Sequence, residues 1–323
     1  MTERTVKKSI YAVSMLLVVF MRIAVSEGIL RGLDDISSDA VWSTTVQCLI
    51  FGLIPFSLYF VYLKTHKEKR AVNKIFGEFG YRGKISLKGA AIVLIISLLT
   101  PYIISCLSSV WYTLISDLGY KSVSRHMKYT TGILFADIAL TAVLPALFEE
   151  FTNRGLLYSA SRNPDKPLRV IFLTAAMFAL MHTNVTQVFY TFFFGLITGG
   201  LVYVTKSIWP AVFCHFVNNF VSVMRSYLSD VGKSAFFDKI YNLFTGSVWG
   251  VTGATLLFFV AVFIVFILFL RLSSVESDRR MKCGEEVKTY DEVITRYENL
   301  PLVFAAVLNG IITVITLVWG IIR

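Results

Sequence analysis

Charged side chains are scarce in this sequence: Asp, Glu, Lys and Arg make up 16% of its 323 residues, whereas hydrophobic residues make up 55%. Soluble globular domains average about 25% charged residues, so this composition excludes a soluble globular protein. Cysteine is scarce too, and the four cysteines are scattered at Cys48, Cys106, Cys214 and Cys283. These positions form neither a disulfide framework nor a zinc-type spacing.

Long hydrophobic segments fill most of the chain instead. We count about nine, near residues 9–26, 41–63, 89–116, 131–157, 168–182, 186–204, 207–229, 247–272 and 300–322. About 20 helical residues cross the ~30 Å hydrocarbon core of a bilayer. The sequence therefore predicts an all-α fold, a polytopic transmembrane helical bundle of eight to nine spans. The first segment lacks an A-x-A-like cleavage site after it, so we interpret it as a retained helix.

Basic residues give the chain a formal net charge of +10, and they gather between the hydrophobic segments. Residues 64–88 hold eight Lys and Arg against two acids, whereas residues 27–39 hold four acids against one Arg. Positive loops mark the cytoplasmic side, so we expect the 64–88 loop and the N-terminus to be cytoplasmic, in a cell membrane. We expect membrane lipid and no nucleic acid as the partner of this loop. The mixed-charge residues 273–299 are expected to form a cytoplasmic solvated or interfacial helix.

Two adjacent acids interrupt one hydrophobic segment. Glu149 and Glu150 lie within residues 131–157, and with Arg154 they spell E-E-x-x-x-R. One acidic side chain at the centre of a spanning helix costs ~2.5–3.5 kcal/mol, so an acid pair there indicates a functional site. Glu150 and Arg154 are spaced for a helical ion pair, whereas Glu149 is turned about 100° away on the helix. The spacing therefore predicts different roles for the two glutamates.

Two of the four histidines, His182 and His215, also lie in hydrophobic segments. Phe178 precedes His182 by one helical turn and shares its face. Asn218 and Asn219 follow His215 by three and four residues, so His215 and Asn219 share a face as well.

The depths of these residues test whether they could meet. Counted from the predicted cytoplasmic helix ends at 1.5 Å per residue, Glu149 and His215 lie roughly 12–15 Å deep. His182 and Asn219 lie roughly 18–20 Å deep on the same scale. All four are therefore expected in one layer, near the middle of the membrane and nearer the cytoplasm.

A carboxylate and an imidazole in a dry pocket can polarise a water molecule that attacks a carbonyl carbon. A second imidazole and an amide can stabilise the resulting oxyanion. This set of side chains predicts peptide-bond hydrolysis without a nucleophilic side chain, and it calls for no metal and no cofactor.

Three stretches carry a family resemblance: E-E-F-T-N-R at 149–154, F-A-L-M-H at 178–182 and H-F-V-N-N at 215–219. They resemble, in the same order, the E-E-x-x-x-R, F-x-x-x-H and H-x-x-x-N/B motifs of the CAAX protease and bacteriocin-processing family, also called the CPBP or ABI family. The resemblance implies an intramembrane glutamic endopeptidase whose chamber opens towards the cytoplasm. The substrates that it implies are peptides or proteins: lipidated CAAX proteins, or bacteriocin or pheromone precursors.

The resemblance also implies a role for each residue that matches a motif. Glu149 would activate the attacking water together with His182, and His215 and Asn219 would form the oxyanion hole. The supporting residues would be Glu150, Arg154, Phe178 and Asn218. We expect residues 131–229 to form the catalytic core, between N-terminal helices in residues 1–130 and C-terminal helices in residues 230–323.

Two other functions stay open at the level of the sequence. A zinc-dependent membrane protease would need three ligands plus water, but the sequence lacks H-E-x-x-H and pairs His215 with an asparagine at i+4. A non-catalytic immunity or scaffold protein, or a transporter, could use the same polar core for binding. The G-x-x-x-G pair Gly195 and Gly199 predicts close helix packing rather than chemistry.

Overall fold

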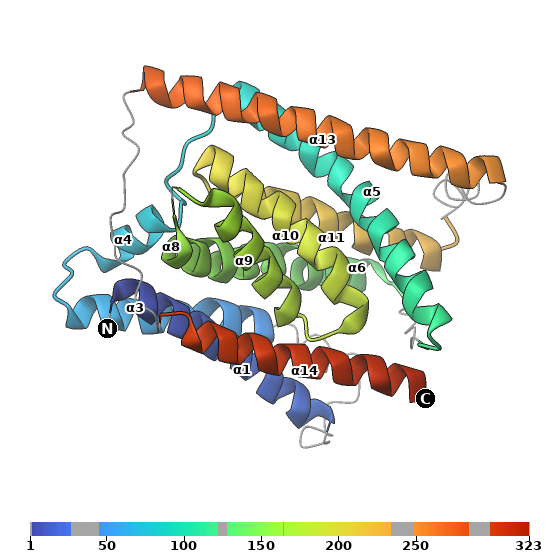
Figure 1. Ribbon diagram of the computed structural model, residues 1–323, viewed down its shortest axis with the longest axis horizontal. Coiled ribbons are helices and arrows are strands. Elements are labelled where there is room, and N and C mark those ends of the chain that lie inside the picture. Colours follow the sequence, from blue (N-terminus) through green and yellow to red (C-terminus); the bar gives the residue numbers. More distant parts are fainter. Residues whose placement is uncertain are drawn as a thin grey trace.

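The computed structural model describes residues 2–26, 45–121, 128–163, 165–233, 248–283 and 298–322 (Figure 1). These residues are mostly helical and contain no strand. The elements are α1 (Glu3–Ser26), η1 (Thr45–Leu53), α3 (Ile54–Thr65), α4 (Ala71–Glu78), α5 (Leu87–Asp117), α6 (Thr131–Asp137), η2 (Ile138–Val143), α7 (Leu144–Glu150), η3 (Phe151–Leu157), α8 (Tyr158–Ser161), α9 (Pro167–Met181), α10 (Val185–Thr205), α11 (Trp209–Asp230), α13 (Val248–Lys282) and α14 (Leu300–Ile322).

The described part of the chain is a helical bundle of a multi-pass membrane protein, which confirms the predicted fold class. Within the described residues, six helices are long and apolar enough to cross a membrane: Cys48–Thr65, Leu87–Asp117, Thr131–Ser161, Val185–Thr205, Thr252–Lys282 and Leu300–Ile322. The predicted number of eight to nine spans is not reached by this measure, because α9 is too short, at 15 residues, and α1 and α11 are not among the six. In Figure 1, α9, α10 and α11 lie between the pair α5 and α13 and the pair α1 and α14.

Residues 131–161 form one continuous helix, which we call the motif helix because it contains the acid pair. It changes from α to π geometry at η2 and again at η3, with Pro145 at the start of the α7 stretch between them. Proline removes a backbone donor, which disturbs the regular α-helical ladder. Short π stretches of this kind are frequent at functional sites. Glu149 and Glu150 lie directly before the second one.

Helices α9 and α10 pack very closely through the predicted glycine face. A Cβ added at Gly195 would lie 2.8 Å from the Cα of Ala175, closer than side chains can approach. At Gly199, the added atom would lie 3.3 Å from the side chain of Ile171. The two glycines therefore bring α10 against α9, as small residues do at helix interfaces in membranes.

The two polar stretches differ from their predicted form. Within residues 64–88, α4 packs onto the bundle and buries Ile75 and Phe79. Residues 273–282 continue α13, which runs unbroken to Lys282, so they do not form a separate helix. The rest of that stretch, and the acidic loop 27–39, lie outside the described residues. One hydrophobic cluster joins all three predicted parts of the chain, from Val6 through Phe178 to Ala305.

Contacts between segments far apart in sequence define two ends of the bundle. One end, which we call the basic end, holds residues 64–88. The hydrogen bonds there are Arg4 to the Arg162 carbonyl, Arg162 to the Glu78 carbonyl, Arg280 to the Val204 carbonyl, and the Ile208 amide to the Gly80 carbonyl. At the opposite end they are the Lys121 amide to the Gly320 carbonyl, the Tyr129 amide to Asp230, and Trp111 to the Val185 carbonyl.

Candidate active site

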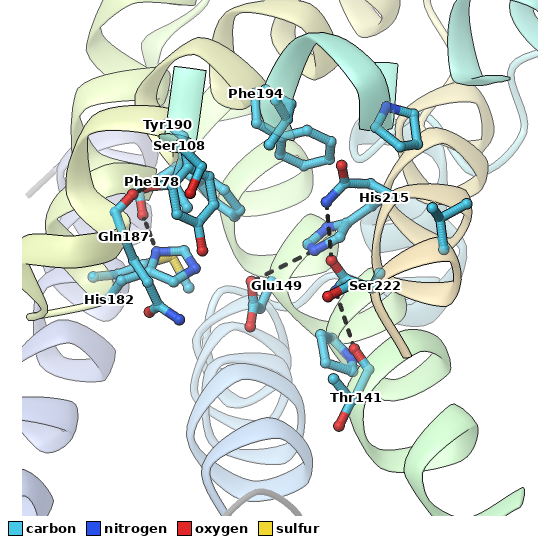
Figure 2. Close-up of a pocket in the computed structure, with 18 of the residues that line it drawn as sticks. Ser108, Thr141, Glu149, Phe178, His182, Gln187, Tyr190, Phe194, His215 and Ser222 are labelled. Carbon is cyan, nitrogen blue, oxygen red and sulfur yellow. Dashed lines mark hydrogen bonds and ion pairs between the residues drawn. The ribbon is translucent and has the colours of Figure 1, made fainter. Parts of the chain in front are cut away.

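A cavity of about 570 Å³ lies inside the bundle. Six of the eight sequence-predicted site residues line it: Glu149, Phe178, His182, His215, Asn218 and Asn219. They come from the motif helix, the end of α9 and the middle of α11, and Figure 2 shows Glu149 between His182 and His215. The other two predicted residues, Glu150 and Arg154, are fully buried beside the cavity.

Glu150 and Arg154 form the predicted ion pair, with Arg154 Nε 3.3 Å from Glu150 Oε2 and both side chains fully buried. Arg154 also donates hydrogen bonds to the Gly195 carbonyl and to the Thr198 hydroxyl of α10. Arg154 is thus held inside the bundle by a carboxylate and two further oxygen atoms. It fixes the motif helix to α10 and balances the charge of Glu150.

His215 is held by the second glutamate, a contact that the sequence did not reveal. Its Nδ1 lies 2.9 Å from Glu150 Oε1. A carboxylate only accepts hydrogen bonds, so we assign a proton to Nδ1. The ring is thereby oriented with Nε2 towards the cavity, 4.0 Å from Glu149 Oε2. Glu150 therefore contacts a cavity imidazole as well as Arg154.

Glu149 is the glutamate that lines the cavity, and its side chain is only 9% exposed. It interacts electrostatically with both histidines. The difference between Glu149 and Glu150 follows from helical phase, because both lie on the regular α7 stretch.

His182 stands at the end of α9, where the chain turns into α10. Its Nδ1 lies 2.8 Å from the carbonyl of Phe178, one turn earlier on the same helix. A carbonyl only accepts, so we assign the proton to Nδ1, which leaves the lone pair of Nε2 for the cavity. The next residue, Thr183, is buried and has φ of 48°, an unusual conformation for a β-branched residue.

The Phe178 ring packs against both imidazoles. Its centroid lies 5.0 Å from the His182 ring and 5.8 Å from the His215 ring, with edge-to-face geometry in each case. The guanidinium of Arg154 lies over its face at 4.6 Å. Phe178 therefore fills the space between the two histidines and the buried ion pair, and its substitution would loosen all three.

The two asparagines are partly occupied by structural contacts. Asn219 donates through Nδ2 to the Thr141 carbonyl of the motif helix at 3.0 Å, and its Oδ1 accepts from Asn218 at 3.2 Å. An amide group has two N–H donors, so one N–H of Asn219 is left for a ligand in the cavity. Asn219 thus joins α11 to the motif helix while it lines the cavity.

Tyr190 is a cavity residue that the sequence analysis missed. It lines the cavity from α10, and Figure 2 shows its hydroxyl directed into the space between His182 and Glu149. A periodic signal was present in the sequence, because the lining residues of α10 recur with helical spacing at Gln187, Tyr190, Thr191 and Phe194. No motif marks this face, so we did not single it out.

The cavity extends from the level of Glu149 and His215 towards the end of the bundle opposite the basic end. Its lining residues Arg22, Ser108 and Arg225 belong to the halves of α1, α5 and α11 that are remote from the basic end. Glu149 and His215, by contrast, lie in the halves of the motif helix and α11 nearer the basic end, so the cavity spans the middle of the bundle. The cytoplasmic basic loop and the chamber opening to the cytoplasm stay predictions.

Potential metal ligands are not clustered in the described residues: no group of three or more His, Cys, Asp or Glu side chains there could hold an ion. The cavity lining instead combines one carboxylate with two imidazoles, amides and hydroxyls. Such a set can accept a proton from water and donate hydrogen bonds to a developing negative charge.

Comparison with known proteins agrees with this chemistry. Residues 131–221 match the family described as Rce1-like, type II CAAX prenyl endopeptidase, and the match includes all the sequence-predicted site residues. No curated protein and no solved structure matches the chain. Residues 131–221 are therefore similar to an Rce1-like type II CAAX prenyl endopeptidase domain, a similarity that supports a multi-pass membrane protease.

Proposed function

We propose that this protein is an intramembrane endopeptidase in which Glu149 and His182 activate a water molecule. One observation carries the proposal: a carboxylate and two imidazoles line one cavity inside a helical membrane bundle. Each imidazole is already held through Nδ1 by a separate acceptor. Rings anchored in this way present Nε2 to a substrate in a fixed geometry, which is how enzymes prepare groups for proton transfer.

The proposed reaction begins with a water that donates one proton to Glu149 and hydrogen-bonds through the other to Nε2 of His182. As Glu149 takes the proton, the oxygen attacks the peptide carbonyl carbon and a tetrahedral oxyanion forms. The carbon–nitrogen bond then breaks, and the leaving amine receives the proton from Glu149. One water is consumed, and the products are a new carboxyl group and a new amine.

The oxyanion needs hydrogen-bond donors. In this mechanism His215 carries a proton on both nitrogens, one shared with Glu150 and the other, on Nε2, directed to the oxyanion. Asn219 contributes its remaining N–H, and the Tyr190 hydroxyl, on the His182 side, is a third donor. Removal of one oxyanion-hole donor typically lowers kcat by about 10²–10³-fold.

The supporting residues hold this geometry. Glu150 orients His215, and Arg154 neutralises Glu150 and ties the motif helix to α10. Phe178 spaces the two imidazoles. Asn218 donates to the Asn219 amide oxygen and thereby fixes which end of that amide faces Thr141.

The volume of the cavity limits what can bind. About 570 Å³ is a normal size for a small-molecule site. It holds a few residues of an extended peptide, so a protein substrate would enter through a short segment. Lipidated proteins and bacteriocin or pheromone precursors are candidate substrates with such segments. We also propose that residues 131–229 are the catalytic core and that eight to nine helices cross the cell membrane.

The test is a cleavage profile. The purified protein in detergent would be incubated with a peptide library, and the products identified by mass spectrometry. The proposal predicts defined cuts that disappear in the Glu149→Gln variant but persist in Glu68→Gln, a matched change in the basic loop. Cleavage that survives Glu149→Gln in a normally folded protein would refute the proposed mechanism.

A further inference from the structure

We infer that Arg162, Lys206 and Arg280 form a binding site for the phosphate group of an anionic phospholipid at the basic end. None of these three residues lines the cavity, so the site is separate from the candidate active site. The inference does not depend on the proposed peptidase function, because lipid binding can be measured without turnover.

Three cations meet at the basic end from segments far apart in the sequence. Arg162 follows α8, Lys206 follows α10, and Arg280 lies in the last turn of α13. Nη1 of Arg280 donates to the Val204 carbonyl at 2.9 Å, two residues before Lys206. Partial burial and, after it, the charges of Arg280 and Arg162 lower the pKa of Lys206 to about 8. The three positive charges are thus close enough to repel one another.

Two tyrosine rings support two of these cations. Nζ of Lys206 lies 4.1 Å from the ring centroid of Tyr203, and the guanidinium of Arg162 lies 5.8 Å from that of Tyr158. Tyr158 is buried in a small hydrophobic cluster, and Tyr203 packs against the same cluster. A cation over a ring face keeps its N–H donors available for an oxygen ligand on its other side.

Acidic side chains do not neutralise this group in the described part of the chain. No ion pair between described residues includes Arg162, Lys206 or Arg280. Glu78, whose backbone carbonyl accepts from Arg162, pairs its carboxylate with two lysines. Glu276, one turn before Arg280 on α13, pairs with the neighbouring arginine. Like charges that are gathered without a counter-ion favour the binding of an anion.

The lengths of the helices place the three cations at the membrane surface. Helix α10 has 21 residues, so it spans about 32 Å, close to the ~30 Å hydrocarbon core, and Lys206 follows it directly. The apolar part of α13 ends near Leu272, so Arg280 lies about 12 Å beyond it. Phospholipid phosphates lie at this level, and basic pockets between spanning helices bind lipid headgroups. Arginine also matches the geometry of phosphate oxygens.

The backbone of Lys206 is a second unusual feature of the site. Its φ of 56° is left-handed, at the end of α10, where glycine or asparagine is the usual residue. A residue in such a conformation persists when its surroundings hold it, often at a binding site. Lys206→Asn therefore removes the charge and suits the backbone.

Titration with short-chain lipids tests the inference. The full-length protein, freed of lipid in a neutral detergent, would be titrated by calorimetry with dioctanoyl phosphatidylglycerol and, separately, with dioctanoyl phosphatidylcholine. The variants would be Lys206→Asn and the control Lys69→Asn. Lys69 is exposed in the basic loop and is not among the charges that act on Lys206.

We expect the wild type to bind phosphatidylglycerol at least about tenfold more tightly than phosphatidylcholine. Lys206→Asn should weaken phosphatidylglycerol binding about fivefold, the usual effect of one basic residue near a charged lipid, whereas Lys69→Asn should leave it unchanged. The unfolding midpoint of Lys206→Asn without lipid should equal or exceed that of the wild type, because asparagine tolerates the left-handed backbone. A lower midpoint together with unchanged lipid binding would make Lys206 merely structural and overturn the inference.

Two further results would overturn it. Equal affinity of the wild type for the two lipids would remove the phosphate-specific site, and equal losses in Lys206→Asn and Lys69→Asn would show only diffuse attraction to basic residues. Glycerol 3-phosphate, as a third ligand, separates a lipid from a soluble phosphate. We expect it to bind at least about tenfold more weakly than phosphatidylglycerol, because it lacks the acyl chains. Equal binding would overturn the assignment to a lipid and leave a site for soluble phosphate compounds.

Discussion

The two walls of the cavity each present a histidine, and the two histidines differ in what holds them. His182, on the α9 wall, gives its Nδ1 proton to a neutral carbonyl of its own helix. His215, on the α11 wall, is held by the buried carboxylate of Glu150. A neutral acceptor leaves Nε2 of His182 to accept a hydrogen bond from water, whereas a carboxylate suits a ring that must carry positive charge. The second contact of each ring thus separates the acceptor for the water from the oxyanion donor.

The largest effect should come from the histidines themselves. We expect His182→Gln to lower kcat by about 10²–10⁴-fold, because the imidazole helps Glu149 to activate the attacking water. His215→Gln keeps a side-chain N–H donor, so we expect a smaller loss of about 10²–10³-fold. Steady-state kinetics on the same reporter peptide would measure both. Equal losses, or a larger loss for His215→Gln, would remove the proposed difference between the two walls.

The next largest effect should come from removal of the carboxylate that holds His215. Glu150→Gln leaves Arg154 without its anion and His215 without its charged partner, and breaking a buried ion pair costs about 3–5 kcal/mol of stability. We expect a lower thermal-unfolding midpoint in detergent and a fall in kcat, with KM little changed. Glu276→Gln is the control, since Glu276 is equally buried and ion-paired, but with Arg279 on α13, outside the cavity lining. Unchanged kcat in a folded Glu150→Gln protein would contradict its role as the orienting carboxylate.

The hydroxyl of Tyr190, on the His182 side of the cavity, is the next donor to test. Tyr190→Phe removes one donor and keeps the ring, so we expect kcat to fall about 10–100-fold while binding of an uncleaved substrate to a Glu149→Gln background stays the same. Tyr203→Phe, on the same helix but outside the cavity lining, should leave kcat unchanged. Equal kcat for both variants would remove Tyr190 from the oxyanion hole.

The smallest effect on kcat, but a clear loss of stability, is expected from a change in the contact between α9 and α10, which form the His182 wall. Gly195→Ala would place a Cβ 2.8 Å from the backbone of Ala175, so α10 must move away from α9. Overpacking of this kind costs typically 1–3 kcal/mol. Gly253→Ala is the matched control, because no atom lies within 4 Å of its added Cβ. Equal unfolding midpoints for the two variants would show that the close contact is not needed.

Much of this architecture could be predicted because it depends on local rules. Hydrophobic length gave the helices, and helical phase separated Glu149 from Glu150, since both residues lie on a regular α stretch. The contact between Glu150 and His215 could not be predicted, because it joins residues 65 positions apart on different helices. Periodicity gives the face of a helix but not the neighbour that the face meets.

The ring contacts beside the acid pair could not be predicted either. Tyr81, from a loop that the sequence marked only as basic, lies 6.4 Å from the ring of Phe151 on the motif helix. The π stretches of the motif helix also escaped prediction, because hydrophobic spacing does not distinguish an α turn from a π turn.

The most direct test of the central claim is a single turnover in H₂¹⁸O with intact-protein mass spectrometry. If water held by Glu149 and His182 attacks the peptide directly, the new carboxyl group gains one ¹⁸O in the first turnover and the enzyme mass never changes. The Glu149→Gln variant should yield no labelled product. A covalent adduct of the peptide with the enzyme during turnover, or labelled product from Glu149→Gln, would contradict the account.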